Sequence, residues 1–210
     1  MPHTLEVRMS AVVATMSITL DGFGSGIHQT EERPFGEVPE SALHRWMVET
    51  PDENRAEIDA IVDAGAFIMG RNMYGPVRGE WDRDWRGWWG PNPPYHAPVF
   101  VLTHYPHDPI EMAGGTTFHF VTDGIHAALE RARDAAGDRD VHVAGGPSTT
   151  NAYLAAGLID ELALQISPSI VGGGLRLFEG VGPLRLEQIS GRRASLVTHV
   201  RYRVLPAETA

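Results

Sequence analysis

The fold of this chain is decided by one stretch, Val141-His142-Val143-Ala144-Gly145-Gly146-Pro147-Ser148-Thr149-Thr150. Residues 141–144 predict a short strand, and Ser148 or Thr149 can cap a helix that ends at Gly157. The free N–H groups and the dipole at the start of that helix favour an anion, so we predict that a pyrophosphate binds at Gly145-Gly146. The alternative, a tight turn with no ligand, stays open because two adjacent glycines also serve that purpose.

Strands and helices alternate on both sides of this stretch. Strands are expected at Val7–Met16, Ala66–Met69, Val99–Thr103, Thr116–Thr122 and Leu162–Val171, and helices at Ser41–Val48, after Pro51-Asp52 and after Asp123. Residues 184–189 and 196–204 predict a C-terminal antiparallel hairpin. The order predicts a three-layer αβα fold with a mostly parallel central sheet.

The composition limits the class of protein. With 210 residues, 42% of them hydrophobic, and no linker-like segment, we expect one domain over residues 1–210. Seventeen basic and twenty-seven acidic residues give a net charge of -10, which argues against nucleic-acid and membrane partners. There is no signal-like start, no apolar run long enough to span a bilayer and no cysteine, so a cytoplasmic location is expected.

Ligands of open α/β sheets collect where the strands end, and two further strand ends carry suitable groups. Gly70-Arg71-Asn72-Met73 places an arginine where its guanidinium could pair with a phosphate, although a lone arginine is more often a surface charge. Thr103-His104 offers a hydroxyl and an imidazole, and Thr103 alone would most often cap the strand end.

These motifs fall in one order along the chain. Residues 16–23, 69–73, 101–103, 144–147, 171–174 and 178–180 together make the sequence similar to the dihydrofolate reductase-like superfamily. It most resembles the branch that contains the C-terminal reductase domain of the bifunctional riboflavin-biosynthesis protein and its stand-alone relatives. The resemblance implies a sheet of about eight strands, NADPH as hydride donor and a homodimer.

The resemblance also implies the residues that contact the cofactor. They are Ala14, Leu20, Gly22, Gly70, Arg71, Asn72, Met73, Thr103, His104, Ala144, Gly145, Gly146, Pro147, Ser148 and Thr149. Met73 stands where classical members carry threonine, so one hydroxyl contact to the phosphates is lost. A neutral His104 beside the 2′-phosphate weakens the preference for NADPH, so NADH is a possible donor.

On the substrate side, the branch places an aspartate at the position of Asp21, which could bind substrate or relay a proton. An ordinary Asp-Gly turn is the alternative. Phe178 and Glu179 come from the family's glycine-rich and aromatic segment. Trp81 and Trp85 belong to residues 79–97, a tryptophan- and proline-rich long loop that could close over a planar heterocycle or simply pack in the core or a dimer interface.

The leading hypothesis is therefore an NADPH-dependent reductase of a small heterocyclic, pterin- or pyrimidine-like, or carbonyl substrate. A non-catalytic protein that binds a nucleotide, pterin or flavin is the alternative, and a dimeric scaffold is a third. No metal site is expected, because neither an H-E-x-x-H pattern nor a further ligand accompanies His104, His107 and Asp108.

Overall fold

A computed structural model of the chain describes residues 10–206. In that range one sheet has nine strands in the order β10-β11-β8-β1-β7-β3-β4-β6-β5, and a second sheet pairs β2 with β9. The strands are β1 (Val12–Thr19), β2 (Phe23–Ser25), β3 (Ala66–Gly70), β4 (Pro98–Leu102), β5 (Ile110–Glu111), β6 (Thr117–Val121), β7 (Val141–Gly145), β8 (Glu161–Ser167), β9 (Leu175–Arg176), β10 (Arg185–Arg193) and β11 (Thr198–Leu205). The helices are α1 (Ser41–Glu49), α2 (Arg55–Val62), α3 (Arg71–Tyr74), α4 (Gly124–Ala136) and α5 (Pro147–Ala155), with a 3₁₀ turn, η1, at Ala113–Gly115.

The centre of the large sheet is parallel and its two edges are antiparallel. Strand β1 pairs in parallel with β7 and β8, β3 with β4 and β7, and β4 with β6. The β10–β11 hairpin joins β8 in antiparallel fashion, and β5 does the same beside β6. The predicted mostly parallel sheet with a C-terminal antiparallel hairpin is confirmed.

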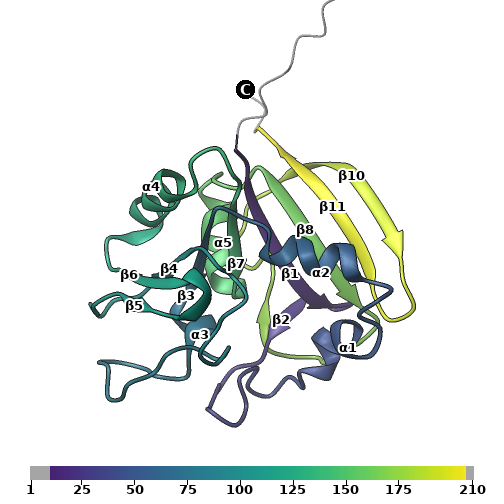
Figure 1. Cartoon of the computed structure of the whole chain (residues 1–210). Helices are drawn as coiled ribbons and strands as arrows, with labels where there is room; N and C mark the ends of the chain where they lie inside the picture. Colours follow the sequence, from purple (N-terminus) through teal and green to yellow (C-terminus); the bar gives the residue numbers. More distant parts are fainter. Residues whose placement is uncertain (1–9, 207–210) are drawn as a thin grey trace, which may run out of the picture.

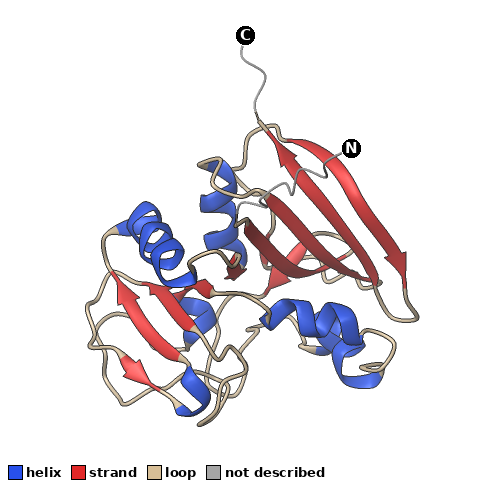
Figure 2. Ribbon diagram, turned by 45° about the horizontal axis from the view of Figure 1, so that its top comes forward, coloured by secondary structure: helices blue, strands red, loops and turns tan. Residues whose placement is uncertain are grey.

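Helices cover both faces of this sheet. One face packs on α4 and α5, where alternate β1 residues Val12, Ala14, Met16 and Ile18 share a core cluster with apolar residues of both helices. Figure 1 shows α4 and α5 beside β7, β3 and β4, whereas α1 and α2 lie beside β1 and β8, and Figure 2 shows the same separation from another angle. The predicted three-layer αβα arrangement is therefore confirmed.

The other face of the sheet holds α1 and α2 through polar as well as apolar contacts. Ser167 Oγ of β8 donates a 3.0 Å hydrogen bond to the carbonyl oxygen of Leu43 in α1. Trp46 of α1 is buried in a cluster with Ala194 and Val197 from the β10–β11 hairpin. These contacts fix α1 over β8.

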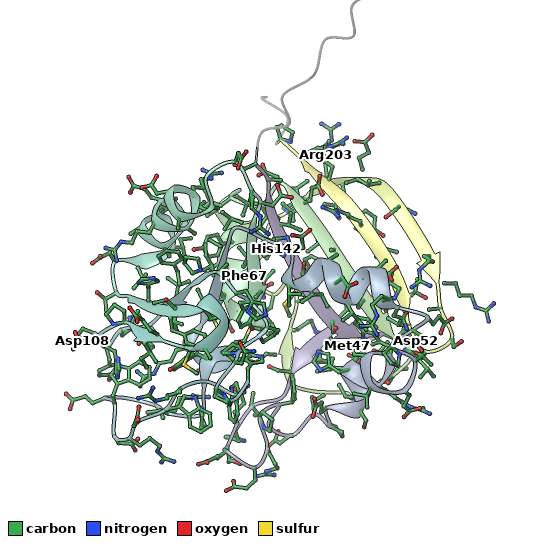
Figure 3. The ribbon with its side chains drawn as sticks, viewed as in Figure 1. Met47, Asp52, Phe67, Asp108, His142 and Arg203 are labelled. Atoms are coloured by element: carbon green, nitrogen blue, oxygen red, sulfur yellow. The ribbon has the colours of Figure 1, made fainter. Side chains whose placement is uncertain are left out.

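A second aromatic core lies on the same face, nearer β3 and β4. Phe67 of β3 meets His142 of β7 edge to face, with ring centroids 5.8 Å apart, and Figure 3 places both near the middle of the molecule. Phe67 also packs on Tyr95, which belongs to the long loop of residues 79–97. That loop contains no helix or strand, as the sequence predicts.

Several predicted boundaries are wrong. The first strand continues to Thr19 instead of ending at Met16, while residues 7–9 of its predicted range lie outside the described residues. The expected loop after it forms β2, because Phe23–Ser25 finds a partner in β9 about 150 residues later. Strand β8 ends at Ser167, not Val171, since Pro168 follows and has no N–H for the ladder.

Among the described helices, none combines the length and the apolar character that crossing a membrane requires.

Candidate active site

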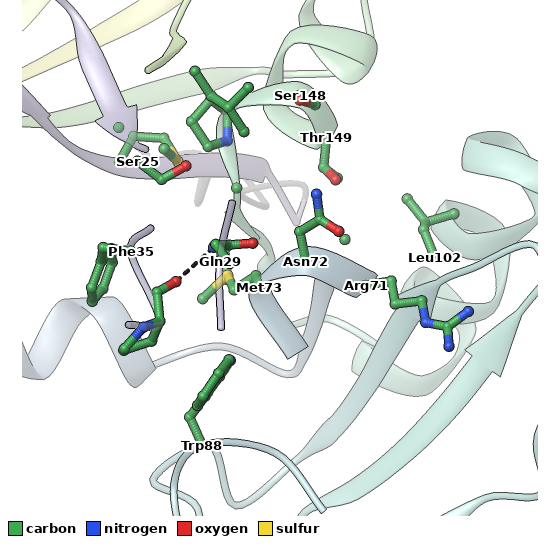
Figure 4. A pocket seen from close by; sticks show the side chains of 18 of the residues that line it. Ser25, Gln29, Phe35, Arg71, Asn72, Met73, Trp88, Leu102, Ser148 and Thr149 are labelled. Atoms are coloured by element: carbon green, nitrogen blue, oxygen red, sulfur yellow. Dashed lines mark hydrogen bonds between the residues drawn. The ribbon is translucent and has the colours of Figure 1, made fainter. Parts of the chain in front are cut away.

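A cavity of about 1060 Å³ opens where the parallel strands end. Its lining comes from β1, from the segments that follow β3, β4 and β7, and from α1. Figure 4 shows Arg71 and Leu102 on one side of this cavity and Gln29 and Phe35 on the other. The cavity therefore has two halves with different chemistry, which we call the Arg71 half and the Phe35 half.

The glycine turn between β7 and α5 lies at the wall of the cavity. Gly146 is the N-cap residue, α5 begins at Pro147, and the Gly145–Gly146 peptide bond is cis. Ser148 and Thr149 are therefore inside the helix, and the prediction that one of them caps it by its side chain is wrong. Their backbone N–H groups belong to the first turn, where no intrahelical acceptor exists, so they remain suited to an anion.

Two glycines let neighbouring elements approach α5. A Cβ atom added to Gly70, at the end of β3, would overlap Thr149 Oγ1. A Cβ atom on Gly24 of β2 would lie 2.8 Å from Pro147 Cγ. Because neither residue has a side chain, the start of α5 is clamped between β3 and β2 at the wall of the cavity.

Arg71 is the strongest candidate for an anion ligand. Its guanidinium carbon lies 3.9 Å from the ring centroid of Trp81 and 5.1 Å from that of Tyr105, and Nη1 donates a 3.4 Å hydrogen bond to Thr103 Oγ1. Nε and Nη2 are buried and have no acceptor among the described residues. Burial, and then the charge of Arg78, lowers the pKa of Arg71 from its usual value. Two unused donors and an unbalanced charge are what a phosphate group would satisfy.

The tryptophans of residues 79–97 divide into two pairs. Trp85 Nε1 donates to the carbonyl oxygen of Tyr74 at 2.9 Å, and the Tyr74 hydroxyl donates back to the carbonyl oxygen of Trp85 at 2.6 Å. Trp81 lies under Arg71. These two residues, expected at the substrate, anchor the loop and do not line the cavity, whereas Trp88 and Trp89 do.

Asp21 holds two loops together outside the cavity lining. Its carboxylate accepts hydrogen bonds from Thr19 Oγ1 at 2.6 Å and from the backbone N–H groups of Val171 and Gly172 at 3.1 Å and 2.8 Å. The Thr19 hydroxyl first, and then these N–H groups, keep the pKa of Asp21 below its usual value. The carboxylate thus ties the turn before β2 to the segment before β9, and both strands contribute to the cavity wall.

The structure brings together most of the residues expected at the cofactor. Those that line the cavity are Gly70, Arg71, Asn72, Met73, Thr103, His104, Ala144, Gly146, Pro147, Ser148 and Thr149. Ala14, Leu20, Gly22 and Gly145 do not line it: Ala14 faces the α4–α5 core, Leu20 and Gly22 lie in the turn before β2, and Gly145 is the last residue of β7. Phe178 also stays outside, and Glu179 lines a separate cavity of about 310 Å³ next to α5.

Sequence reasoning missed the Phe35 half of the cavity. It is lined by Thr15 and Ser17 of β1, Gln165 of β8, His44 and Met47 of α1, and Phe35. Burial lowers the pKa of His44 to about 4, so its imidazole is neutral at neutral pH. One sequence feature could have indicated this half: polar residues at alternate positions of strands whose other face is apolar.

Among residues 10–206, no group of three or more His, Asp or Glu side chains could hold a metal ion.

Comparison with known proteins places these observations in a family. The family model of the RibD C-terminal domain matches residues 10–200. A structure from Shewanella sp. PV-4, assigned to riboflavin biosynthesis, superposes with a TM-score of 0.64 at 21% identity, covering 93% of this chain and 99% of the other. No curated protein gives a significant match.

Two further solved structures resemble the chain. RibD of Acinetobacter baumannii gives a TM-score of 0.60 at 17% identity, covering 94% of this chain and 59% of that one. The riboflavin biosynthesis reductase of Saccharomyces cerevisiae gives 0.52 at 12% identity, covering 97% and 92% of the two chains. At such identities these likenesses establish the fold.

Proposed function

Since this chain belongs to the RibD C-terminal domain family, we propose that it reduces a small heterocyclic, pterin- or pyrimidine-like, or carbonyl substrate with NADPH. The family makes it an oxidoreductase of the riboflavin-biosynthesis reductase type, and the predicted resemblance to the dihydrofolate reductase-like superfamily is confirmed. The observation that carries the proposal is the pair of unpartnered, buried Arg71 donors at the cavity wall.

The residues of the Arg71 half fit the phosphates of a nicotinamide dinucleotide. Arg71 offers Nε and Nη2 to one phosphate, and Thr103 Oγ1, already bonded to Nη1, lies beside them. The N–H groups of Ser148 and Thr149 offer a second anion position at the start of α5, which the clamp by Gly70 and Gly24 keeps in place. When bound, NADPH would supply the hydride.

The remaining residues of the chain shape and close the site. Trp88 and Trp89 line the cavity from the long loop, and the hydrogen bonds between Trp85 and Tyr74 hold that loop down. Asp21 acts as a positioning residue, because its hydrogen bonds to Val171 and Gly172 hold the wall formed by β2 and β9. Together these contacts would exclude water from the reacting groups.

A direct test is a fluorescence titration with NADPH and with NADH, followed by turnover assays on pterins, pyrimidines and quinones. We expect saturable binding of NADPH and its oxidation in the presence of one substrate class. Lack of binding of both nucleotides at millimolar concentration would overturn the proposal.

One observation favours the non-catalytic alternative. Asp21, the residue expected to relay a proton, does not line the cavity. Tight binding of a pterin or flavin, with no NADPH oxidation on any compound of the panel, would support a ligand-binding protein instead.

We also propose that the protein works as a cytoplasmic homodimer. Strand β10 lies at one edge of the sheet, and its apolar Leu186 and Ile189 are exposed. An unpaired edge with exposed apolar side chains is suited to pairing with a second copy. Light scattering on the purified protein would detect the dimer, and a monomer at all concentrations would exclude it.

A further inference from the structure

The Phe35 half of the cavity contains a buried amide whose oxygen is unused. The side chain of Gln165 lines the cavity although the residue is only 4% exposed. Its Oε1 atom has no donor among the described residues. A buried acceptor without a partner is uncommon unless something else satisfies it, because no hydrogen bond offsets the loss of its contact with water.

The neighbours of Gln165 in the sheet do not satisfy this oxygen. Ser17 lies opposite it on β1 and His199 opposite it on β11. The Nε2 atom of His199 lies 2.9 Å from Asn54 Oδ1, which can only accept, so Nε2 carries the proton. Burial keeps the pKa of His199 below its usual value, and the Nδ1 atom of the neutral ring is then an acceptor itself. The neutral His199 ring does not donate to Gln165, and no donor among the described residues forms a hydrogen bond with Oε1.

The surroundings of Gln165 select an uncharged ligand. Thr15 and Ser17 supply hydroxyls from the sheet, and His44 supplies a neutral imidazole from α1. The bond from Ser167 to Leu43 fixes α1 next to this part of β8, so His44 is held over the sheet. Phe35, whose ring centroid lies 5.0 Å from that of His44, adds an apolar wall suited to a planar ring.

We propose that Gln165 determines substrate specificity: its Oε1 accepts a hydrogen bond from a ring N–H of an uncharged, planar heterocycle bound in the Phe35 half. This inference rests on the proposed function only in treating that half as the substrate side. A heterocycle whose ring nitrogens carry methyl groups offers no such donor and leaves the oxygen unpaired. The chain therefore distinguishes ligands by a donor at one edge of the ring.

The test compares two fluorescent probes, lumazine, which has ring N–H groups, and 1,3-dimethyllumazine, which has none. We expect the wild-type chain to bind lumazine at least about tenfold more tightly, the value of one hydrogen bond to a buried group. Gln165→Leu should weaken lumazine binding by about the same factor and remove most of the preference. Gln165→Met serves as a second apolar variant if Gln165→Leu fails to fold.

Gln188→Leu is the matched control, because it makes the same substitution at an exposed position of strand β10. It should bind both probes as the wild type does. A preference that persists in Gln165→Leu and Gln165→Met, or no lumazine binding by the wild type at 5 mM, would overturn the inference. Titration of the same proteins with NADPH separates the two proposals: intact NADPH binding with no probe discrimination refutes only the role of Gln165.

Discussion

Replacing Arg71 by methionine should make the ligand-free protein more stable and its binding of NADPH weaker. The change removes a guanidinium with two buried, unpartnered donors, each of which costs about 1–3 kcal/mol. It also removes the stacking on Trp81, worth about 0.5–2 kcal/mol, and the 3.4 Å hydrogen bond to Thr103, worth about 1 kcal/mol. The cost of the unpartnered donors is the larger effect, so we expect a net stabilisation of about 1 kcal/mol.

Binding should change in the opposite direction. A hydrogen bond to a charged group contributes about 1.5–3 kcal/mol, so Arg71→Met should raise the Kd for NADPH about 10- to 100-fold. Urea unfolding without ligand gives the free energy of unfolding, and fluorescence titration gives the Kd. Both are measured on the same protein preparations.

Arg78 offers a matched control at the same cavity. Its Nη1 donates to the carbonyl oxygen of Gly75 and its Nη2 to Gln29 Oε1, each at 2.9 Å, so its donors are satisfied. Arg78→Met should therefore lower the free energy of unfolding and weaken NADPH binding less than Arg71→Met does. If Arg71→Met destabilises the protein as Arg78→Met does and leaves NADPH binding unchanged, Arg71 is a packing residue and our reasoning is refuted.

Three further predictions test the site. Gly70→Ala should lower stability by about 1 kcal/mol through its overlap with Thr149 Oγ1, and Thr149→Ala in the same chain should restore it; simple additivity in a double-mutant cycle would contradict the clamp. Asp21→Asn should lower stability and turnover together at neutral pH, because an amide nitrogen cannot accept from Gly172 N–H; loss of turnover alone, with unchanged thermal unfolding, would point to direct chemistry. His44 has a pKa of about 4 in the folded chain against 6.5 when unfolded, so its contribution to stability is lost as pH falls through that interval. Between about pH 7.5 and about pH 4.5 the wild type should lose about 2.5 kcal/mol more than His44→Gln, by urea unfolding, and equal losses would show that His44 titrates normally.

The glycine turn and the Arg71 motif were predictable because each is a short run of consecutive residues. Gly70 and Gly145 are the last residues of apolar strands, and the ends of parallel strands meet at one edge of a sheet. We could therefore predict that both motifs lie at one site without knowledge of distant contacts. Ser148 and Thr149 were assigned to the right helix end but to the wrong role, since Gly146 occupies the cap position.

Residues whose environment comes from distant segments could not be placed in this way. Asp21 lies in the expected loop, yet its partner Gly172 is 151 residues away, and the carboxylate is bound to that segment outside the cavity lining. Trp81 and Trp88 occur in one loop with similar neighbours in sequence. Trp81 packs against Arg71 and the aromatic core, whereas Trp88 lines the cavity, and only the tertiary structure separates these two roles.

The sequence by itself determined the alternation of strands and helices and the glycine-containing ends of β3 and β7 where we propose that anions bind, because local periodicity and glycine positions govern both. Only the tertiary structure decided the Phe35 half of the cavity. Gln165, His44 and Ser17 come from β8, α1 and β1, and they share one wall because α1 is fixed over β8 by Ser167 and Trp46. Burial of Gln165 without a partner is likewise a property of that packing, since no stretch of the chain contains its surroundings.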